Sequence, residues 1–175
     1  ENKKSLEGVH RNALKINNLI QEVMALDKAE NQDLSAPNLL NSQIDLVAYV
    51  KQITEEWQNN TAYAHLEFYF SSEIESVFVY TDVSKLGSIL NNLLSNACKY
   101  NRQEKGSIAV KITKGEETLS LVIVDTGIGI SPEDLPYICS KFYRSSSDEV
   151  NRLEGTGVGL YLVKSYCDQL GWEMD

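Results

Sequence analysis

The middle of the chain constrains the fold most, because a long amphipathic helix pattern leads directly into two apolar strand patterns. Asp82 is a typical N-cap residue, and the helix that it predicts runs to Tyr100. Two strands follow over residues 107–113 and 118–124, and they are apolar enough to be covered on at least one face. The apolar positions of the helix recur at steps of three and four and therefore share one face: Leu86, Ile89, Leu90, Leu93, Leu94 and Ala97. These patterns predict a two-layer α/β domain.

Weaker patterns predict further elements on either side of this unit. Helical periodicity over residues 45–57 indicates a helix, and residues 66–70 and 77–80 are typical of strands. A short helix is expected near residues 132–140, and a final helix over residues 157–170.

The N-terminal part of the chain, residues 5–30, is typical of one long helix with an apolar seam. Such a helix needs a partner, which is either a second helix of a bundle or its own domain. The proline-containing segment 35–38 then interrupts the pattern and predicts a linker. The seam consists of Leu6, Val9, Ala13, Ile16, Ile20 and Val23.

Length and charge limit the classes of function. With 175 residues the chain is expected to form one domain with an appendage, and its net charge of −9 argues against broad binding of nucleic acid or anionic membranes. Cys98, Cys139 and Cys167 lack the pair spacing of a metal site, so we expect reduced thiols and a cytoplasmic setting. No apolar run reaches the roughly 18 residues of a membrane span, although the chain could be one piece of a protein that does cross a membrane.

Two polar patterns carry candidate chemistry. Asn92 and Asn96 lie one helical turn apart and project from the same face, where an amide oxygen is a competent Mg²⁺ ligand beside phosphate oxygens. Asp125 ends an apolar strand before a turn in which Gly127 and Gly129 permit close backbone approach to a ligand. The alternative reading is a solvated helix face and an ordinary strand-to-helix turn.

Three alternating glycines, Gly155, Gly157 and Gly159, stand directly before the last predicted helix. Backbone N–H groups at such a terminus attract phosphate oxygens and supply the positive field that a chain of this charge needs. The pattern is not a dinucleotide fingerprint, because Leu160 stands where that motif has glycine, and it is not a Walker loop. A helix entry without a ligand is the alternative.

Four stretches occur together in a fixed order: residues 92–100, 125–130, 141–144 and 155–160. Jointly they resemble the N, G1, F and G2 boxes of the ATP-binding domain of sensor histidine kinases, within the superfamily that includes gyrase, Hsp90 and MutL. The resemblance covers roughly residues 30–175. It implies a Bergerat-type α/β sandwich, with a mixed sheet carrying helices on one face, and it implies Mg-ATP as the ligand.

The resemblance also implies roles for individual residues. Asn96 would be the magnesium ligand with Asn92 nearby, Lys99 would meet phosphate, and Tyr100 and Asp125 would contact adenine. Residues 142–154 would form a lid segment over the nucleotide, with Phe142 as its apolar anchor and Arg144 reaching the terminal phosphates. The implied nucleotide-binding set is Asn92, Asn96, Lys99, Tyr100, Asp125, Gly127, Ile128, Gly129, Phe142, Arg144, Gly155, Thr156, Gly157, Val158, Gly159 and Leu160.

One substitution favours the kinase branch of the superfamily. ATP-hydrolysing relatives carry a glutamate four residues before the magnesium asparagine, where this chain has Asn92, which cannot take a proton. Catalysis would then rest on Asn92, Lys99 and Arg144 as positioning and charge-stabilising groups. His10 lacks the sequence context of a phosphoacceptor, so the acceptor histidine is expected upstream of this chain.

The expected organisation is a partial second helix of a dimerisation hairpin over residues 1–33 and a catalytic domain over residues 34–175 without the family's terminal strands. The resemblance implies that the whole protein is a membrane-anchored homodimer that phosphorylates its own histidine and then a response-regulator aspartate. The alternatives are a hydrolysing ATPase of the same superfamily and a docking module that retains the fold without useful nucleotide affinity.

Overall fold

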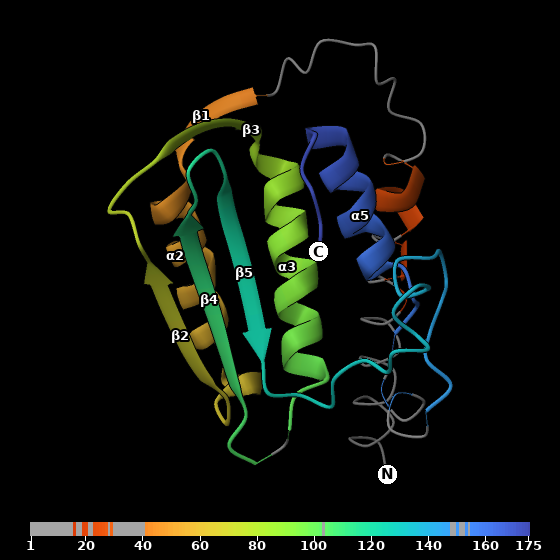
Figure 1. Cartoon of the computed structure of the whole chain (residues 1–175). Coiled ribbons are helices and arrows are strands. Elements are labelled where there is room, and N and C mark those ends of the chain that lie inside the picture. Colours follow the sequence, from red (N-terminus) through yellow and green to blue (C-terminus); the bar gives the residue numbers. More distant parts are fainter. Residues whose placement is uncertain are drawn as a thin grey trace.

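The structure, a computed structural model, describes residues 41–102, 104–147, 150, 153 and 155–175, together with 16, 19, 20, 23–27 and 29. His10, the predicted linker and most of the predicted N-terminal helix lie outside the described residues. The described part is a two-layer α/β arrangement in which helices lie behind a three-stranded sheet (Figure 1). No helix in this part is long and apolar enough to cross a membrane.

The main sheet is mixed, as the resemblance implied. Its strands are β2 (Glu67–Ser72), β4 (Ser107–Lys114) and β5 (Leu119–Asp125), in the order β2-β4-β5. The β2–β4 pair is parallel, and the β4–β5 hairpin is antiparallel with Ile108 opposite Asp125. The polar carboxyl end of β5 therefore lies beside the start of β4, at the edge where the chain leaves the sheet.

A second, two-stranded sheet was only half predicted. In it β1 (Asn41–Asp45) pairs antiparallel with β3 (Phe78–Asp82). The sequence of β1 is polar and shows no apolar alternation, so it gives no local strand signal. Its strand conformation comes from the backbone hydrogen bonds to β3, which is a tertiary effect.

Within residues 41–175, the described helices that complete the fold are α2 (Leu46–Gln58), α3 (Val83–Lys99) and α5 (Gly159–Leu170). Asp82 caps α3 as predicted, because its Oδ1 accepts hydrogen bonds from the backbone N–H groups of Ser84 and Lys85. The last helix begins two residues later than predicted, since Gly157 has φ of +75°, which is not helical. A short 3-10 helix, Thr61–Tyr63, was not predicted.

The helix predicted near residues 132–140 is a series of turns. Its backbone bonds alternate between i→i+3 and i→i+4 patterns, as in Asp134 N–H to the Ser131 carbonyl at 3.0 Å and Ile138 N–H to the Asp134 carbonyl at 3.1 Å. Pro136 interrupts the ladder, because it has no N–H to donate and its ring crowds the carbonyl four residues earlier. The missing hydrogen bond and the crowding by the proline ring outweigh the helical periodicity of this segment.

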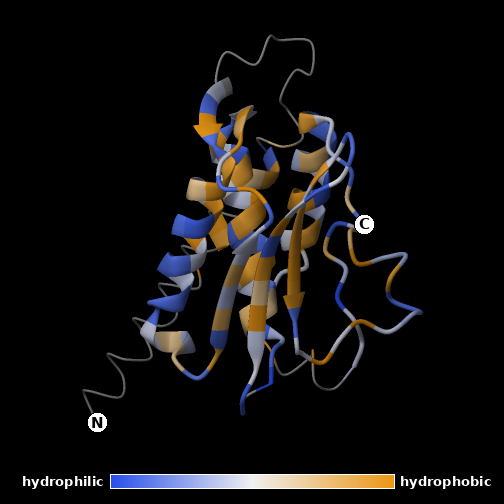
Figure 2. Ribbon diagram, turned by 60° about the vertical axis from the view of Figure 1, so that its left-hand side comes forward, coloured by the Kyte–Doolittle hydropathy of each residue, from blue (hydrophilic) through white to orange (hydrophobic). Residues whose placement is uncertain are grey.

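Two hydrophobic clusters surround α3. One fills the space between the main sheet and the α2–α3 layer, and Leu86, Leu90, Leu94, Ile108 and Val110 are fully buried in it. The other joins α3 to α5 through Ile89, Val158, Leu162 and Val163. In Figure 2 hydrophobic residues colour much of the strands and helices that form these clusters. Because α3 packs in both clusters, its position is defined from two sides.

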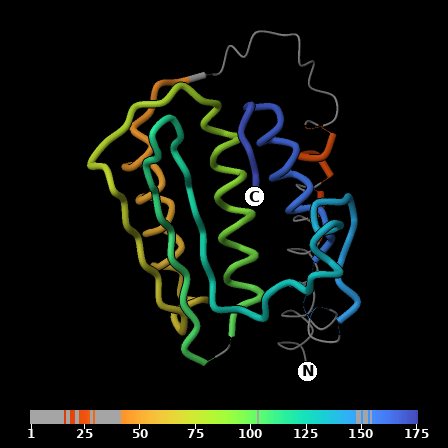
Figure 3. Tube along the Cα trace, in the orientation of Figure 1, coloured from red at the N-terminus to blue at the C-terminus, as the bar shows by residue number. Residues whose placement is uncertain are grey.

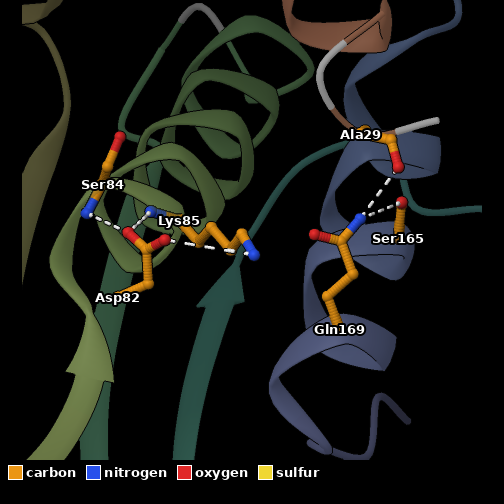
Figure 4. Close-up of polar contacts among 6 residues, drawn as sticks. All are labelled: Ala29, Asp82, Ser84, Lys85, Ser165 and Gln169. Atoms are coloured by element: carbon orange, nitrogen blue, oxygen red, sulfur yellow. Dashed lines mark hydrogen bonds and ion pairs between the residues drawn. The ribbon is translucent and has the colours of Figure 1, made fainter. Parts of the chain in front are cut away.

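The described residues of the N-terminal helix differ in how far they are buried. Leu26 and Ala29 are buried against α5, and Gln169 Nε2 donates a 2.9 Å hydrogen bond to the Ala29 carbonyl (Figure 4). Ile16, Ile20 and Val23 are instead exposed, although they belong to the same apolar seam. Packing on its own domain therefore accounts for the end of the helix, while the seam itself still lacks a partner within the described residues.

Cys98, on the buried face of α3, yields a first testable prediction. Burial raises the pKa of the Cys98 thiol to about 12, so at pH 8 only about one molecule in 10⁴ carries the reactive thiolate. We expect iodoacetamide at pH 8 to leave Cys98 unmodified in the folded protein and to alkylate it in urea, as read by mass spectrometry of its tryptic peptide. Folded-state alkylation at the rate of a free cysteine would contradict this burial.

Candidate functional site

A cavity of about 1060 Å³ is lined by residues from the C-terminal half of α3, from the end of β5 and from the chain between β5 and α5. Figure 3 shows this connection running from β5 past the C-terminal end of α3 toward α5. Asn96, Asp125 and Gly157 line the cavity together, although they are far apart in the sequence. The volume is at the upper end of the range that is typical of small-molecule sites. The three glycine- and asparagine-containing motifs thus converge on one cavity.

The two asparagines of α3 lie beside the start of α5. Asn92 Nδ2 donates a 2.8 Å hydrogen bond to the Ser88 carbonyl, which fixes the direction of the amide. A Cβ added to Gly159 would lie 2.9 Å from Asn92 Oδ1 and 4.0 Å from Asn96 Nδ2. Glycine is therefore needed at residue 159 for α5 to begin so close to the amides, and this contact places both amides next to the helix N-terminus.

The other end of the cavity is formed where β5 meets the end of α3. Asp125 Oδ1 accepts a 2.7 Å hydrogen bond from the Gly127 N–H, and the Ile128 N–H donates to the Tyr100 carbonyl at 3.0 Å. A Cβ on Gly127 would collide with that carbonyl and with Asp125 Oδ1. Ala97, Ile123 and Ile128 also line the cavity, so it offers apolar side chains as well as the Asp125 carboxylate.

The charges around the cavity are mixed. Among the described lining residues, Lys99 and Arg144 are cations, whereas Asp125, Glu133 and Asp134 are acids. Lys99 Nζ donates a 3.0 Å hydrogen bond to the Tyr100 hydroxyl and directly approaches Gly155. The Lys99 charge therefore lies against the glycine turn, where the N–H groups that precede α5 add a further positive field.

Arg144 is anchored to the backbone of the lid segment. Its Nη1 donates to the Gly155 carbonyl at 2.9 Å, and its Nη2 donates to the carbonyls of Val150 and Leu153 at 2.8 and 2.6 Å. Arg144 also lines the cavity. A contact of its guanidinium with phosphate, in contrast, stays a prediction.

Three residues of the predicted set do not line the cavity. Gly127 lies behind the turn, and Val158 is buried in the cluster between α3 and α5. Phe142 is 63% exposed and has an unusual φ of +64°, and its backbone N–H donates to the Gly157 carbonyl at 3.0 Å. Their structural contribution is to shape the turns on either side of the cavity. The remaining members all line it: Asn92, Asn96, Lys99, Tyr100, Asp125, Ile128, Gly129, Arg144, Gly155, Thr156, Gly157, Gly159 and Leu160.

Sequence reasoning missed Asp134, Tyr143 and Leu19, which also line the cavity. The Tyr143 hydroxyl donates a 2.6 Å hydrogen bond to Asp134 Oδ1. This bond, with smaller contributions from Ser145 and Ser131, lowers the pKa of the Asp134 carboxyl below its usual value. Tyr143 stands within the third motif, but no sequence signal pairs it with Asp134. Leu19 lies in the predicted N-terminal helix but outside its apolar seam, so it carried no signal for the site.

Comparison with known proteins agrees with this geometry. Residues 81–175 match the family model described as histidine kinase-, DNA gyrase B-, and HSP90-like ATPase. The sensor histidine kinase RppB of Synechocystis is 29% identical over 91% of this chain, and the chain spans 34% of the length of that relative.

Solved structures give the same picture. The mycobacterial sensor histidine kinase MprB is 26% identical, with a TM-score of 0.63 over 75% of this chain and 80% of that chain. Full-length ShkA in complex with AMPPNP is 18% identical, with a TM-score of 0.79 over 97% of this chain and 34% of that chain. At that identity the likeness to ShkA concerns the fold alone.

Proposed function

The chain belongs to the family of histidine kinase-, DNA gyrase B- and HSP90-like ATPases, and we propose that it serves a sensor histidine kinase by presenting the γ-phosphate of Mg-ATP to a histidine. ATP is the ligand of this family's domain. The observation that carries the proposal is the single cavity lined by Asn96, Asp125 and Gly157. An amide, a carboxylate and a glycine turn thereby line one cavity, which supports a single nucleotide site.

The proposed placement follows the chemistry of the two ends of the cavity. Adenine lies at the apolar end, where the Asp125 carboxylate accepts a hydrogen bond from its exocyclic amine. The phosphates lie toward the glycine turn, Lys99 and the N-terminus of α5. This orientation puts the terminal phosphate near the asparagines of α3 and the lid segment.

The donor set at the phosphate end fits magnesium. Asn96 supplies a neutral, hard amide oxygen, and triphosphate oxygens and waters complete the coordination that Mg²⁺ prefers. When bound, Mg²⁺ neutralises charge that develops on the transferred phosphoryl group. The chain's own contribution is to hold the nucleotide in line through Asn92, Lys99 and the glycine turn.

Asn92 favours transfer over hydrolysis. Its amide lies at the position where hydrolysing relatives carry a glutamate base, and its Nδ2 already donates to the Ser88 carbonyl. An amide cannot accept the proton of an attacking water, whereas a neutral imidazole attacks with its own lone pair. In that step the bond from the γ-phosphorus to the bridging oxygen breaks, a phosphorus–nitrogen bond forms, and ADP leaves.

The remaining proposals concern the whole protein. Residues 1–33 would be part of a dimerisation helix and residues 34–175 the catalytic domain. The exposed Ile16, Ile20 and Val23 would then pack in a homodimeric four-helix bundle. We also propose a response-regulator receiver domain as the next phosphate acceptor, and a cytoplasmic position of this domain in a membrane-anchored sensor.

The test of the proposed function is a phosphotransfer assay in trans. The chain is mixed with the dimerisation hairpin of the full protein and with γ-labelled Mg-ATP, and an acid-labile, base-stable phosphoramidate is expected on the hairpin. No label with the hairpin's histidine intact would contradict the proposal. Steady phosphate release by the chain alone would indicate a hydrolysing relative, and absence of Mg-ADP binding in calorimetry would indicate a docking module.

A further inference from the structure

Two hydrogen bonds hold alternate peptide groups of the glycine turn. Arg144 Nη1 donates to the Gly155 carbonyl at 2.9 Å, and the Phe142 N–H donates to the Gly157 carbonyl at 3.0 Å. The same guanidinium holds the carbonyls of Val150 and Leu153 through Nη2. Arg144, near the start of the lid segment, is therefore fastened to Val150 and Leu153 further along it and to the adjoining Gly155, so three carbonyls point toward one cation.

Peptide geometry converts these bonds into an orientation of N–H groups. In a trans peptide the C=O and N–H bonds point in opposite directions, and the chain has no cis peptide among its described residues. Drawing the Gly155 carbonyl toward Arg144 therefore turns the Thr156 N–H away from the guanidinium. The bond from Phe142 likewise turns the Val158 N–H away from Phe142, at the N-terminus of α5.

The backbone around Phe142 and the glycine turn approach each other closely. Phe142 and Gly157 both have positive φ, of +64° and +75°. A Cβ on Gly157 would lie 2.5 Å from the Tyr143 carbonyl oxygen and 2.7 Å from the Phe142 carbonyl carbon. A non-glycine residue such as Phe142 seldom adopts this conformation, which tends to persist where surrounding contacts enforce it.

We propose that Arg144 is a positioning residue, which holds the lid backbone so that the N–H groups of the glycine turn face the nucleotide phosphates. This inference rests on the proposed function, because it assigns those N–H groups to phosphate. It differs from a direct contact of Arg144 with phosphate, since the guanidinium acts through the backbone. The planar fork of arginine suits three separate carbonyls, whereas a lysine ammonium is a single point charge.

Nucleotide binding separates the two roles. The variants are Arg144→Ala and Arg144→Lys, and the matched control is Arg102→Ala, which removes an exposed arginine outside the cavity. Calorimetry with adenosine, Mg-ADP and Mg-AMPPNP is expected to show about tenfold weaker binding of both nucleotides in both Arg144 variants, with adenosine unchanged. Near-normal affinity of Arg144→Lys, or a loss confined to AMPPNP, would overturn the proposal in favour of a direct charge contact.

Amide hydrogen exchange tests the same proposal without nucleotide. In the nucleotide-free protein, peptides that cover residues 142–157 are expected to exchange faster in both Arg144 variants than in the wild type and in Arg102→Ala. Unchanged exchange would overturn the proposal even if nucleotide affinity fell. Failure of the proposed function itself would look different, because the wild type would then bind neither nucleotide while the exchange difference remained. Should Arg144→Ala fold poorly, as seen by circular dichroism, Arg144→Lys decides both measurements.

Discussion

Asn96→Ala is expected to lower the rate of phosphate transfer to the dimerisation hairpin by at least about 100-fold, the largest functional effect that we expect in this chain. The variant removes the amide oxygen that we propose as the only protein ligand of Mg²⁺ among the described lining residues. Without it the metal no longer draws the terminal phosphates toward α3. Adenosine affinity is expected to stay within about twofold, because we propose that adenine is held by Asp125 on β5 and not by Asn96.

The measurement is the initial rate of phosphoramidate formation at saturating Mg-ATP. Asn91→Ala is the matched control, because Asn91 occupies the same helix but lies outside the cavity, where its Oδ1 accepts a 2.9 Å hydrogen bond from Trp57 Nε1. Its transfer rate is expected to remain close to that of the wild type. Comparable losses in both variants would mean that α3, and not the metal site, had been perturbed.

Asp82→Ala is expected to destabilise the fold by about 3–5 kcal/mol, the largest stability effect that we expect. Lys85 Nζ lies 4.0 Å from Asp82 Oδ2, and the two side chains are only 7% and 5% exposed (Figure 4). Removing the carboxylate leaves a buried ammonium without this partner and also deletes the N-cap of α3. Since small domains are stable by about 5–15 kcal/mol, the variant would lose a large share of its stability.

Urea unfolding followed by tryptophan fluorescence gives the measurement, with the midpoint shifting at an unchanged slope. Asp45→Ala is the matched control, because Asp45 caps α2 in the same way but from a more exposed position. The loss of unfolding free energy in Asp45→Ala is expected to be much smaller than in Asp82→Ala. Lys85→Met tests whether the buried ion pair or the cap causes the loss. In this variant Asp82 keeps its hydrogen bonds to two backbone N–H groups, so Lys85→Met should destabilise the fold less than Asp82→Ala. Equal effects of Asp82→Ala and Asp45→Ala would show that only the cap matters.

The elements that the sequence predicted well are those whose signal is local. The helix after Asp82 has a cap residue and an uninterrupted apolar face, and the following hairpin has apolar strands on both sides of a short turn. Elements that depend on distant partners were not predicted. For example, β1 is polar and forms a strand through its pairing with β3. At residues 132–140 a helical pattern was overruled by the missing N–H of Pro136.

Some features of the candidate site were likewise predicted from the sequence, and others were not. Its motifs could be identified from the sequence because glycines, asparagines and an aspartate at the end of a strand are chemically distinctive without knowledge of the fold. The pairing of Tyr143 with Asp134, and the attachment of Arg144 to three backbone carbonyls, have no such signal. These contacts join side chains to groups that the folded chain brings near, and backbone carbonyls are the same at every residue.

By itself the sequence predicted the type of domain, through periodicity and the resemblance of four motifs, and most of the residues that line the cavity, because motifs and periodicity are properties of short segments. Only the tertiary structure decided that Asn96, Asp125 and Gly157 share one cavity, that Leu26 packs on the domain while Ile20 stays exposed, and which way Arg144 points. The physical reason is that distances between remote segments depend on how α3 is packed between the sheet and α5, and that packing is a property of the whole chain.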